Sequence, residues 1–173
     1  MGMDVFGKEP SPKMAKNKDG DDVRVGEYFR NSGWWWRPLA TYCLTMAPHV
    51  SARCEYWHSN DGDGLDAAKS KELAAILREE LSSGRTKAYA EIRQAEIKAT
   101  PTTPCVVCDG TGSCAAPASG AGEWFDENGK QKYCNECDGT GRQKTADRLY
   151  PFSEENVESW AAFLENCGGF EIH

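Results

Sequence analysis

The chain has 173 residues, of which 39% are hydrophobic and 27% charged, and its net charge is −7. This composition indicates a folded domain with a modest core. The apolar runs are too short to span a membrane, so we expect no membrane partner. The acidic balance argues against a protein that coats nucleic acid, because such binding depends on clustered Lys and Arg.

The cysteine usage and the N-terminal residues indicate the compartment. The chain begins without a basic region followed by an apolar block, so we expect no secretory signal. Eight cysteines would suit a secreted disulfide scaffold, but their paired spacing is typical of metal binding in a reducing environment. We therefore expect a cytoplasmic protein.

Two candidate strands lie near the N-terminus. Met3–Phe6 can form a short strand, and Val23–Phe29 can extend again. Between them, Gly7–Asp22 is rich in Lys, Pro, Gly and Asp, which favours a surface loop.

A run of three tryptophans follows. Three consecutive indoles cannot all face one core, whether the backbone is helical or extended. Pro38 fits the first turn of a helix that Pro48 ends. The tryptophans either anchor the core or contribute to an aromatic binding surface. The candidate surface comprises Trp34, Trp35, Trp36 and Trp57.

A polar loop precedes the strongest helix pattern, and it concentrates His58, Asn60, Asp61, Asp63 and Asp66. Acids alternating with Gly resemble a calcium loop, but the first and twelfth positions would be serines, where an EF-hand has an acid and a bidentate Glu. A second interpretation is that Asp63 or Asp66 caps the following helix. A third is a catalytic or divalent-metal site built from His58, Asp61 and Asp63. Ca²⁺ or Mg²⁺ at Asn60–Asp66 is the cofactor that this loop would imply.

The remaining periodic segments predict three helices and a final strand. Leu65–Leu81 and Thr86–Ala99 are amphipathic, and the short Ser82–Gly84 connection favours an antiparallel pair. The last helix begins after Ser153, an N-cap residue, and ends at Gly168-Gly169. Phe170–Ile172 alternates and can pair with the strand near Val5. The expected fold is therefore α+β, with about four helices and a few short strands.

The clearest chemistry is a repeated motif, Cys-x-x-Cys-Asp-Gly-Thr-Gly, at 105–112 and 134–141. Two thiols at this spacing can grip one metal ion, and two pairs complete a tetrahedral shell that suits a structural zinc ion. The expected ligands are Cys105, Cys108, Cys134 and Cys137. A hairpin turning at Asn128-Gly129 would bring the two pairs together.

The other cysteines leave alternatives open. Cys114 lies near the motif and could compete as a ligand, and Cys167 follows the stripe of the last helix and suits packing. A second metal site could combine Cys43, Cys54, His49 and His58, because Cys54 and His58 are four residues apart.

The charge around the motif bears on partners. Six acids and two bases give residues 105–141 a net charge of −4, and a zinc ion with four thiolates adds a further −2. Arg142, Lys144 and Arg148 offer only a small basic patch nearby. We therefore rank nucleic-acid binding below protein binding.

The repeated motif, carried by Cys105–Gly112 and Cys134–Gly141, resembles the Cys-x-x-Cys-x-Gly-x-Gly zinc domain of DnaJ-type (Hsp40) co-chaperones. In that family four repeats bind two zinc ions, so two repeats imply one. The resemblance covers residues 105–141 only, and the chain has no His-Pro-Asp signature of a J-domain. Elsewhere, Trp34–Leu39, Trp57–Asp66 and Tyr150–Ile172 resemble a recurrent uncharacterised protein of bacteria and their phages.

Together these patterns predict a single α+β body formed by residues 1–104 and 142–173, with residues 105–141 as a zinc-binding hairpin insert. The function that we expect is a small intracellular zinc-binding protein, a non-catalytic accessory factor with a protein partner. The alternatives are a metal-dependent enzyme that uses His58, Asp61 and Asp63, and a nucleic-acid-binding zinc finger.

Overall fold

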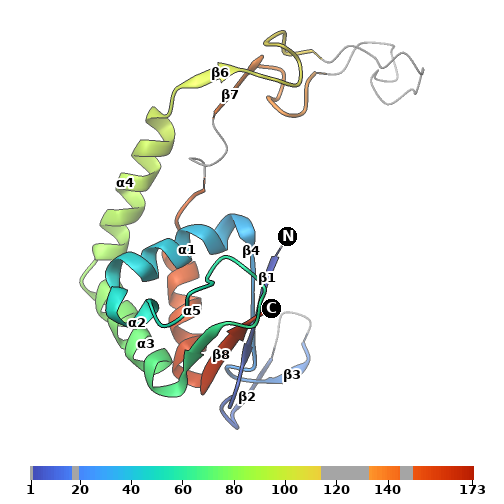
Figure 1. Ribbon diagram of the computed structural model, residues 1–173. Coiled ribbons are helices and arrows are strands. Elements are labelled where there is room, and N and C mark those ends of the chain that lie inside the picture. Colours follow the sequence, from blue (N-terminus) through green and yellow to red (C-terminus); the bar gives the residue numbers. More distant parts are fainter. Residues whose placement is uncertain (1, 17–19, 114–132, 145–149) are drawn as a thin grey trace. The chain divides into compact units, whose positions relative to one another are not determined.

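The computed structural model describes residues 2–16, 20–113, 133–144 and 150–173 (Figure 1). The chain divides into two compact units. Met1–Ala95 and Tyr150–His173 form the first, which we call the body, and Glu96–Leu149 form the second, which we call the cysteine unit. Short antiparallel strands and helices build the body, so the predicted α+β class is confirmed. No helix in the described ranges is both long and apolar enough to cross a membrane.

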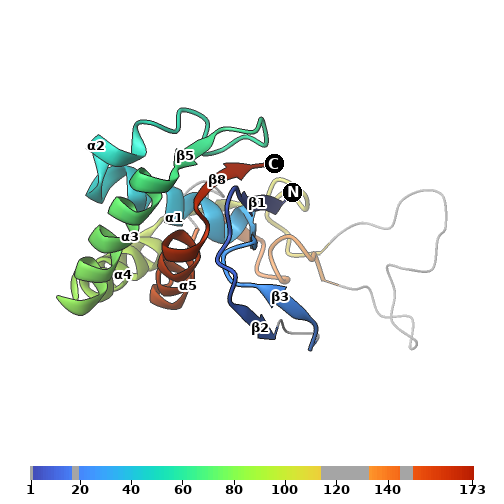
Figure 2. The ribbon, with the colours of Figure 1, turned by 90° about the horizontal axis from the view of Figure 1, so that it is seen from below.

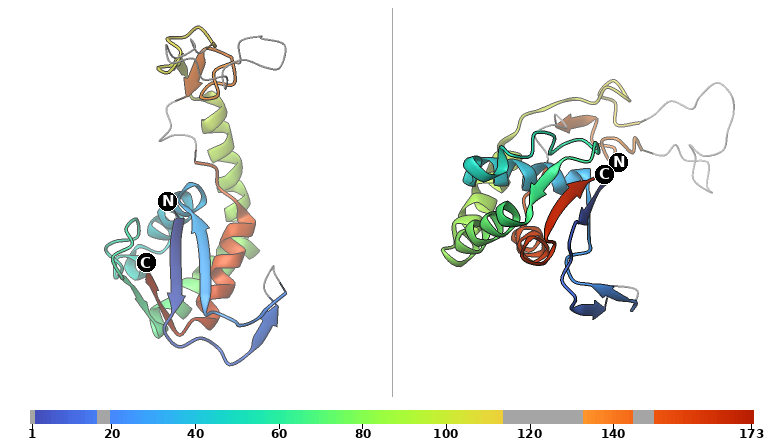
Figure 3. Two further views of the ribbon diagram at one scale, coloured as in Figure 1. Left: turned by 90° about the vertical axis from the view of Figure 1, so that its right-hand side faces the viewer. Right: turned by 60° about the horizontal axis from the view of Figure 1, so that its bottom comes forward.

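Four antiparallel strands form the sheet of the body, in the order β4-β1-β8-β5. Their bounds are Gly2–Gly7 for β1, Tyr28–Ser32 for β4, Gly64–Asp66 for β5 and Gly169–Ile172 for β8. The predicted pairing of the two chain ends is confirmed, because Val5 lies opposite Ile172. The C-terminal strand is therefore central in the sheet, next to β1 (Figure 3).

Successive side chains of these strands point to opposite faces of the sheet. Val5, Leu65 and Phe170 are fully buried against the helices. On the other face, Phe6 and Tyr28 are 45% and 47% exposed, and their rings lie 5.1 Å apart. Only one face of the sheet is thus covered by the core.

Three long helices of the body cover that face: α1 (Gly33–Met46), α3 (Ala67–Ser82) and α5 (Glu154–Asn166). A short helix, α2 (Pro48–Ser51), follows α1. Figure 2 shows α3 and α5 running side by side, and these two helices form the main helix contact of the body. Ser153 caps α5 by accepting a hydrogen bond from the Asn156 N–H, as its sequence predicts.

Helix α1 begins five residues earlier than expected, at Gly33, and contains Pro38 in its interior. This start places the whole tryptophan run on the first turn of the helix, so the indoles are distributed around its axis. Trp36 faces the core and is 1% exposed, whereas Trp34 and Trp35 are 43% and 39% exposed. The prediction that the three cannot share one core is confirmed.

The predicted antiparallel pair of α3 and α4 (Arg85–Ala99) is wrong, because α3 packs mainly against α5. Helix α4 has a narrow apolar stripe, and its Ile92 is 61% exposed. The turn between α3 and α4 is held instead by the buried carboxylate of Glu80. This group accepts hydrogen bonds from the Tyr42 hydroxyl at 2.9 Å and from Arg85 Nε at 2.8 Å.

Two further expectations change at strand level. Leu65 does not begin the helix but lies in β5, opposite Phe170. The segment predicted as a surface loop contains β2 (Met14–Lys16), which pairs with β3 (Asp22–Arg24) in a separate two-stranded sheet. Exposed side chains cover most of this hairpin, which explains why it carries no hydrophobic pattern.

The core of the body is built around three indoles. The ring centroids of Trp36 and Trp57 are 5.9 Å apart, and Trp160 lies 5.3 Å from Trp36 in an edge-to-face arrangement. Two buried indole N–H groups donate to backbone oxygens: Trp36 Nε1 to Trp57 and Trp57 Nε1 to Ser51. These bonds fix the segment after α2 onto α1.

Candidate metal centre

The four predicted zinc ligands converge in the cysteine unit. Their sulfur atoms all lie within 4.8 Å of one another, and all four residues are buried. The sulfurs of Cys105 and Cys134 are 3.9 Å apart, and those of Cys108 and Cys137 are 3.7 Å apart. A zinc ion at about 2.3 Å from each sulfur requires edges of about 3.8 Å. The four thiols therefore fit one zinc ion.

The two metal-binding loops have the same backbone conformation. In each, the residue after the second cysteine has a positive φ, 48° at Asp109 and 47° at Asp138. The first cysteine carbonyl accepts from the Gly110 N–H in one loop and from the Gly139 N–H in the other, at 3.1 and 3.0 Å. The repeated sequence thus forms the same turn twice, since the left-handed conformation recurs at equivalent positions.

Glycines allow the two loops to approach closely. A Cβ on Gly112 would lie 2.2 Å from the carbonyl oxygen of Gly139, and a Cβ on Gly141 would lie 2.2 Å from that of Gly110. The same approach lets each loop support the other, because Cys105 N–H donates to Gly141 and Cys134 N–H donates to Gly112, both at 2.9 Å. No side chain fits where the two backbones cross.

Backbone N–H groups also point at the sulfurs. Gly112 N–H donates to Cys108 Sγ and Gly141 N–H donates to Cys137 Sγ, each at 3.3 Å. Burial raises the pKa of the Cys105 thiol. Burial acts in the same direction on Cys108, but the Gly112 N–H and the neighbouring thiols outweigh it and lower its pKa to about 7. The Gly112 N–H and the neighbouring thiols thus favour the thiolate of Cys108, and thiolate is the form that binds metal.

Sequence reasoning missed two threonines that complete the loops. The hydroxyl of Thr111 donates to the Cys108 carbonyl at 2.7 Å, and that of Thr140 donates to the Cys137 carbonyl at 2.6 Å. Both occupy the same position of the repeat, which is the signal that could have revealed them. The strands β6 (Thr102–Pro104) and β7 (Arg142–Lys144) then close the base of the site.

Arg142 has a structural role at this base. Its Nε donates to Thr102 Oγ1 and its Nη2 donates to the Thr102 carbonyl, both at 2.7 Å. The guanidinium is therefore engaged within the cysteine unit. The predicted hairpin turn at Asn128-Gly129, Cys114 and Arg148 lie outside the described residues.

The remaining described cysteines, Cys43, Cys54 and Cys167, are free and buried in the body. Burial raises the pKa of Cys43 to about 12, and burial together with the charge of Asp63 raises that of Cys54 to about 12. Both thiols are therefore protonated at neutral pH. Among the described residues, the four cysteines of the cysteine unit are the group whose ligand atoms converge, and no such group includes His49 or His58.

The polar loop of the body uses two of its acids to hold the backbone. Asp63 accepts hydrogen bonds from the N–H groups of Glu55, Tyr56 and Gly64 at 2.5, 2.8 and 2.7 Å. Burial acts to raise the pKa of Asp63, but these N–H groups outweigh it and the pKa is lowered. Asp66 caps α3 by accepting from the Lys69 N–H at 2.8 Å.

The other members of the loop are more exposed. Asp61 is exposed, and the Asn60 side chain donates to the Gly2 carbonyl at 3.4 Å. Burial and the nearby charge of Arg37 lower the pKa of His58. Of the four tryptophans expected at a binding surface, Trp36 and Trp57 are core residues and Trp34 and Trp35 reach the surface.

The class of protein that these observations define is an α+β domain with a four-cysteine metal centre of the kind that holds structural zinc. No family model, curated protein or solved structure matches the chain.

Proposed function

We propose that the protein is a non-catalytic, zinc-stabilised interaction factor that binds a protein partner through its first cysteine loop. The observation that carries the proposal is the exposure of Val106 and Val107, 76% and 57%, between two buried metal ligands. Exposed apolar side chains on a rigid support are typical of contact surfaces.

The comparison between the two loops strengthens this argument. The positions equivalent to Val106 and Val107 are occupied by Asn135 and Glu136, which are also exposed. Both loops have the same turns and the same cysteine positions. Because Asn and Glu serve equally well at these positions, holding the metal does not require valine, and the valines are better explained by a partner.

The metal then serves to hold the loop in shape. A loop whose buried cluster consists of four cysteines depends on the ion for its conformation. We propose that residues 105–141 form an insert in a single α+β domain made of residues 1–104 and 142–173, and that the insert presents the valines. The motif is that of a DnaJ-type zinc domain with one pair of repeats. A site of four thiolates suits a reducing compartment such as the cytoplasm.

The enzyme and nucleic-acid alternatives have less support. The carboxylate of Asp63 is already bonded to three N–H groups, and that of Asp66 to the start of α3. Arg142, the basic residue closest in sequence to the second metal loop, is bonded to Thr102. A non-catalytic role in protein binding is therefore the function that we propose.

The test exchanges the exposed residues of one loop for those of the other, in the double variant V106N/V107E. Zinc content is measured first, and we expect it to stay at one ion per chain. Quantitative affinity capture from a lysate of the native host then compares this variant with the wild-type chain. Proteins that bind the loop should fall at least tenfold in the variant, because a charged side chain replaces an apolar contact.

The matched control is N135A/E136A, which alters the second loop at the equivalent positions and should leave capture unchanged. The proposal fails if every protein captured by the wild-type chain is captured equally by V106N/V107E. It also fails if the wild-type chain captures nothing above the level of an unloaded matrix.

A further inference from the structure

A hollow of about 550 Å³ lies in the body at the start of α1. Its lining includes Gly33, Trp34, Arg37, His58, Ser59 and Tyr150, and no Asp or Glu of the described residues belongs to the lining. A volume of this size is within the range of small-ligand sites. In a chain with a net charge of −7, a hollow whose described lining residues include no acid is a distinctive local environment.

Arg37 supplies a positive charge to this hollow. It forms no ion pair with any described residue, and its guanidinium lies over the Tyr150 ring, 5.9 Å from the centroid. By contrast, the guanidinium of Arg78 is bonded to the carboxylate of Glu165 at 2.8 and 3.1 Å. Stacking on Tyr150 positions the guanidinium group of Arg37 and leaves its N–H groups available to an anion.

The first turn of α1 adds polarity of the same sign. The Ser32 side chain makes no capping bond, and the turn contains no acid. The first N–H groups of a helix lack intrahelical acceptors and carry the positive end of its dipole. Gly33 and Trp34, the first two helix residues, line the hollow.

The segment before β5 adds polar residues to the lining of the hollow. Ser59 belongs to this lining, and its hydroxyl oxygen is itself enclosed, with no hydrogen-bond partner among the described residues. His58 and Asn60, its neighbours in sequence, line the hollow as well and add further polar groups.

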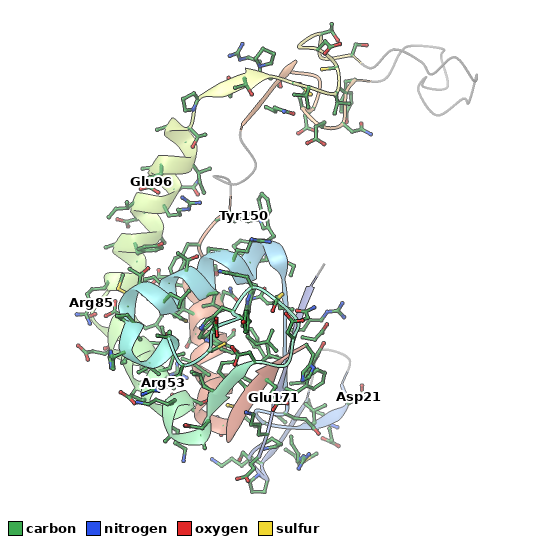
Figure 4. All side chains as sticks on the ribbon, in the orientation of Figure 1. Asp21, Arg53, Arg85, Glu96, Tyr150 and Glu171 are labelled. Carbon is green, nitrogen blue, oxygen red and sulfur yellow. The ribbon has the colours of Figure 1, made fainter. Side chains whose placement is uncertain are left out.

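The remaining wall is aromatic. The Trp34 side chain is 43% exposed and meets Tyr150 edge to face, with ring centroids 5.0 Å apart. Figure 4 shows Tyr150 next to α1. Trp34 and Arg37 are three residues apart on one helix and therefore share a face. A flat ring that stacks on Trp34 would place an attached anionic group near Arg37.

We propose that this hollow binds a mononucleotide-type ligand, with a phosphate at Arg37 and the N-terminus of α1 and a flat base against Trp34. Nucleic-acid bases stack favourably on exposed aromatic side chains, whatever the base. A phosphate would bind here because the uncapped N–H groups at the start of α1 and the neighbouring Arg37 are both positively polarised.

Isothermal titration calorimetry with three probes tests the proposal: adenosine monophosphate, adenosine and inorganic phosphate. The monophosphate should bind the wild-type chain at least tenfold more tightly than either fragment. R37Q should weaken its binding at least tenfold, because the phosphate loses its cation. W34A should weaken the monophosphate and leave inorganic phosphate unchanged.

The matched control is R53Q, which removes another exposed arginine of the body that is not part of the lining (Figure 4). Thermal unfolding of each variant verifies its fold. The proposal is overturned if the monophosphate shows no saturable binding, if R37Q and R53Q bind it equally, or if W34A leaves its affinity unchanged. V106N/V107E should bind the monophosphate normally, so this site and the proposed protein contact fail or succeed separately.

Discussion

In the body, the indoles of Trp36, Trp57 and Trp160 pack among side chains from three helices and the sheet. In the described part of the cysteine unit, the buried hydrophobic cluster consists of the four cysteines. The first cluster draws its stability from apolar area removed from water. The second has too few apolar atoms for that, and its four converging thiols fit a metal ion instead. The same chain therefore uses two different sources of order.

The difference explains what each unit demands of its sequence. Packing accepts many combinations of apolar residues of suitable volume, and the residues that meet in the body come from distant parts of the chain. Metal binding requires four thiols at fixed spacing and glycines at the crossing of two loops. The structure of the cysteine unit can consequently be predicted from a short motif, whereas only the general class of the body can be predicted.

The largest expected effect is the loss of zinc. Chelation, or Cys134→Ser, should abolish order in the cysteine unit, because structural zinc contributes about 10–16 kcal/mol of apparent binding free energy. The body should retain its thermal transition, since its core contains none of the four ligands. Hydrogen exchange followed by mass spectrometry, with zinc content measured in parallel, distinguishes the two units.

The control for this prediction is Cys43→Ala, which removes a buried thiol of the body and should leave one zinc ion per chain. Unchanged hydrogen-exchange protection of the Cys105 and Cys134 amides after chelation would show that the cysteine unit does not depend on the metal. Loss of the body's thermal transition on chelation would show that the body depends on the metal as well.

The reciprocal change targets the body. Trp160→Ala should reduce the free energy of unfolding of the body by about 3–5 kcal/mol, because a fully buried indole leaves a large cavity. Zinc content should stay at one ion per chain. Urea unfolding followed by circular dichroism measures the loss.

Trp34→Ala is the matched control for this change. Because Trp34 is 43% exposed, its substitution should reduce the free energy of unfolding by less than about 1 kcal/mol. Equal destabilisation by the two substitutions would mean that packing does not distinguish them. In that case the core around Trp160 would not be what stabilises the body.

A smaller effect concerns the glycines of the metal loops. Gly141→Ala should weaken zinc binding at least tenfold, or about 1.4 kcal/mol, because its Cβ would lie 2.2 Å from the Gly110 carbonyl oxygen. Gly110→Ala has a similar positive φ, 78° against 70°, but its Cβ would approach no atom closer than 3.4 Å. Competition with a chromophoric chelator compares the two affinities, and equal values would exclude the crossing of the loops as the cause.

Local features were predictable where neighbours in sequence decide them. The Ser153 cap, the Asp66 cap as one of the interpretations considered, and the pairing of the chain ends all follow from short patterns. The start of α1 was not predictable from the sequence. Pro38 is typical of a helix start, but the helix begins at Gly33, because Trp36 packs against Trp57 and Trp160. Whether α4 or α5 packs against α3 depends on which of the two has the wider apolar stripe. The stripe of α5 is wider than that of α4.

The sequence by itself determined the metal shell, since the spacing of Cys105, Cys108, Cys134 and Cys137 and the glycines beside them specify both ligand set and loop conformation. Only the tertiary structure decided which tryptophans are core, that Asp63 supports the backbone, and that Arg37 and Ser59 line one hollow. The physical reason is range. Thiols three residues apart meet through local turns, whereas Arg37, Ser59 and Tyr150 meet only after the helices and the sheet have packed.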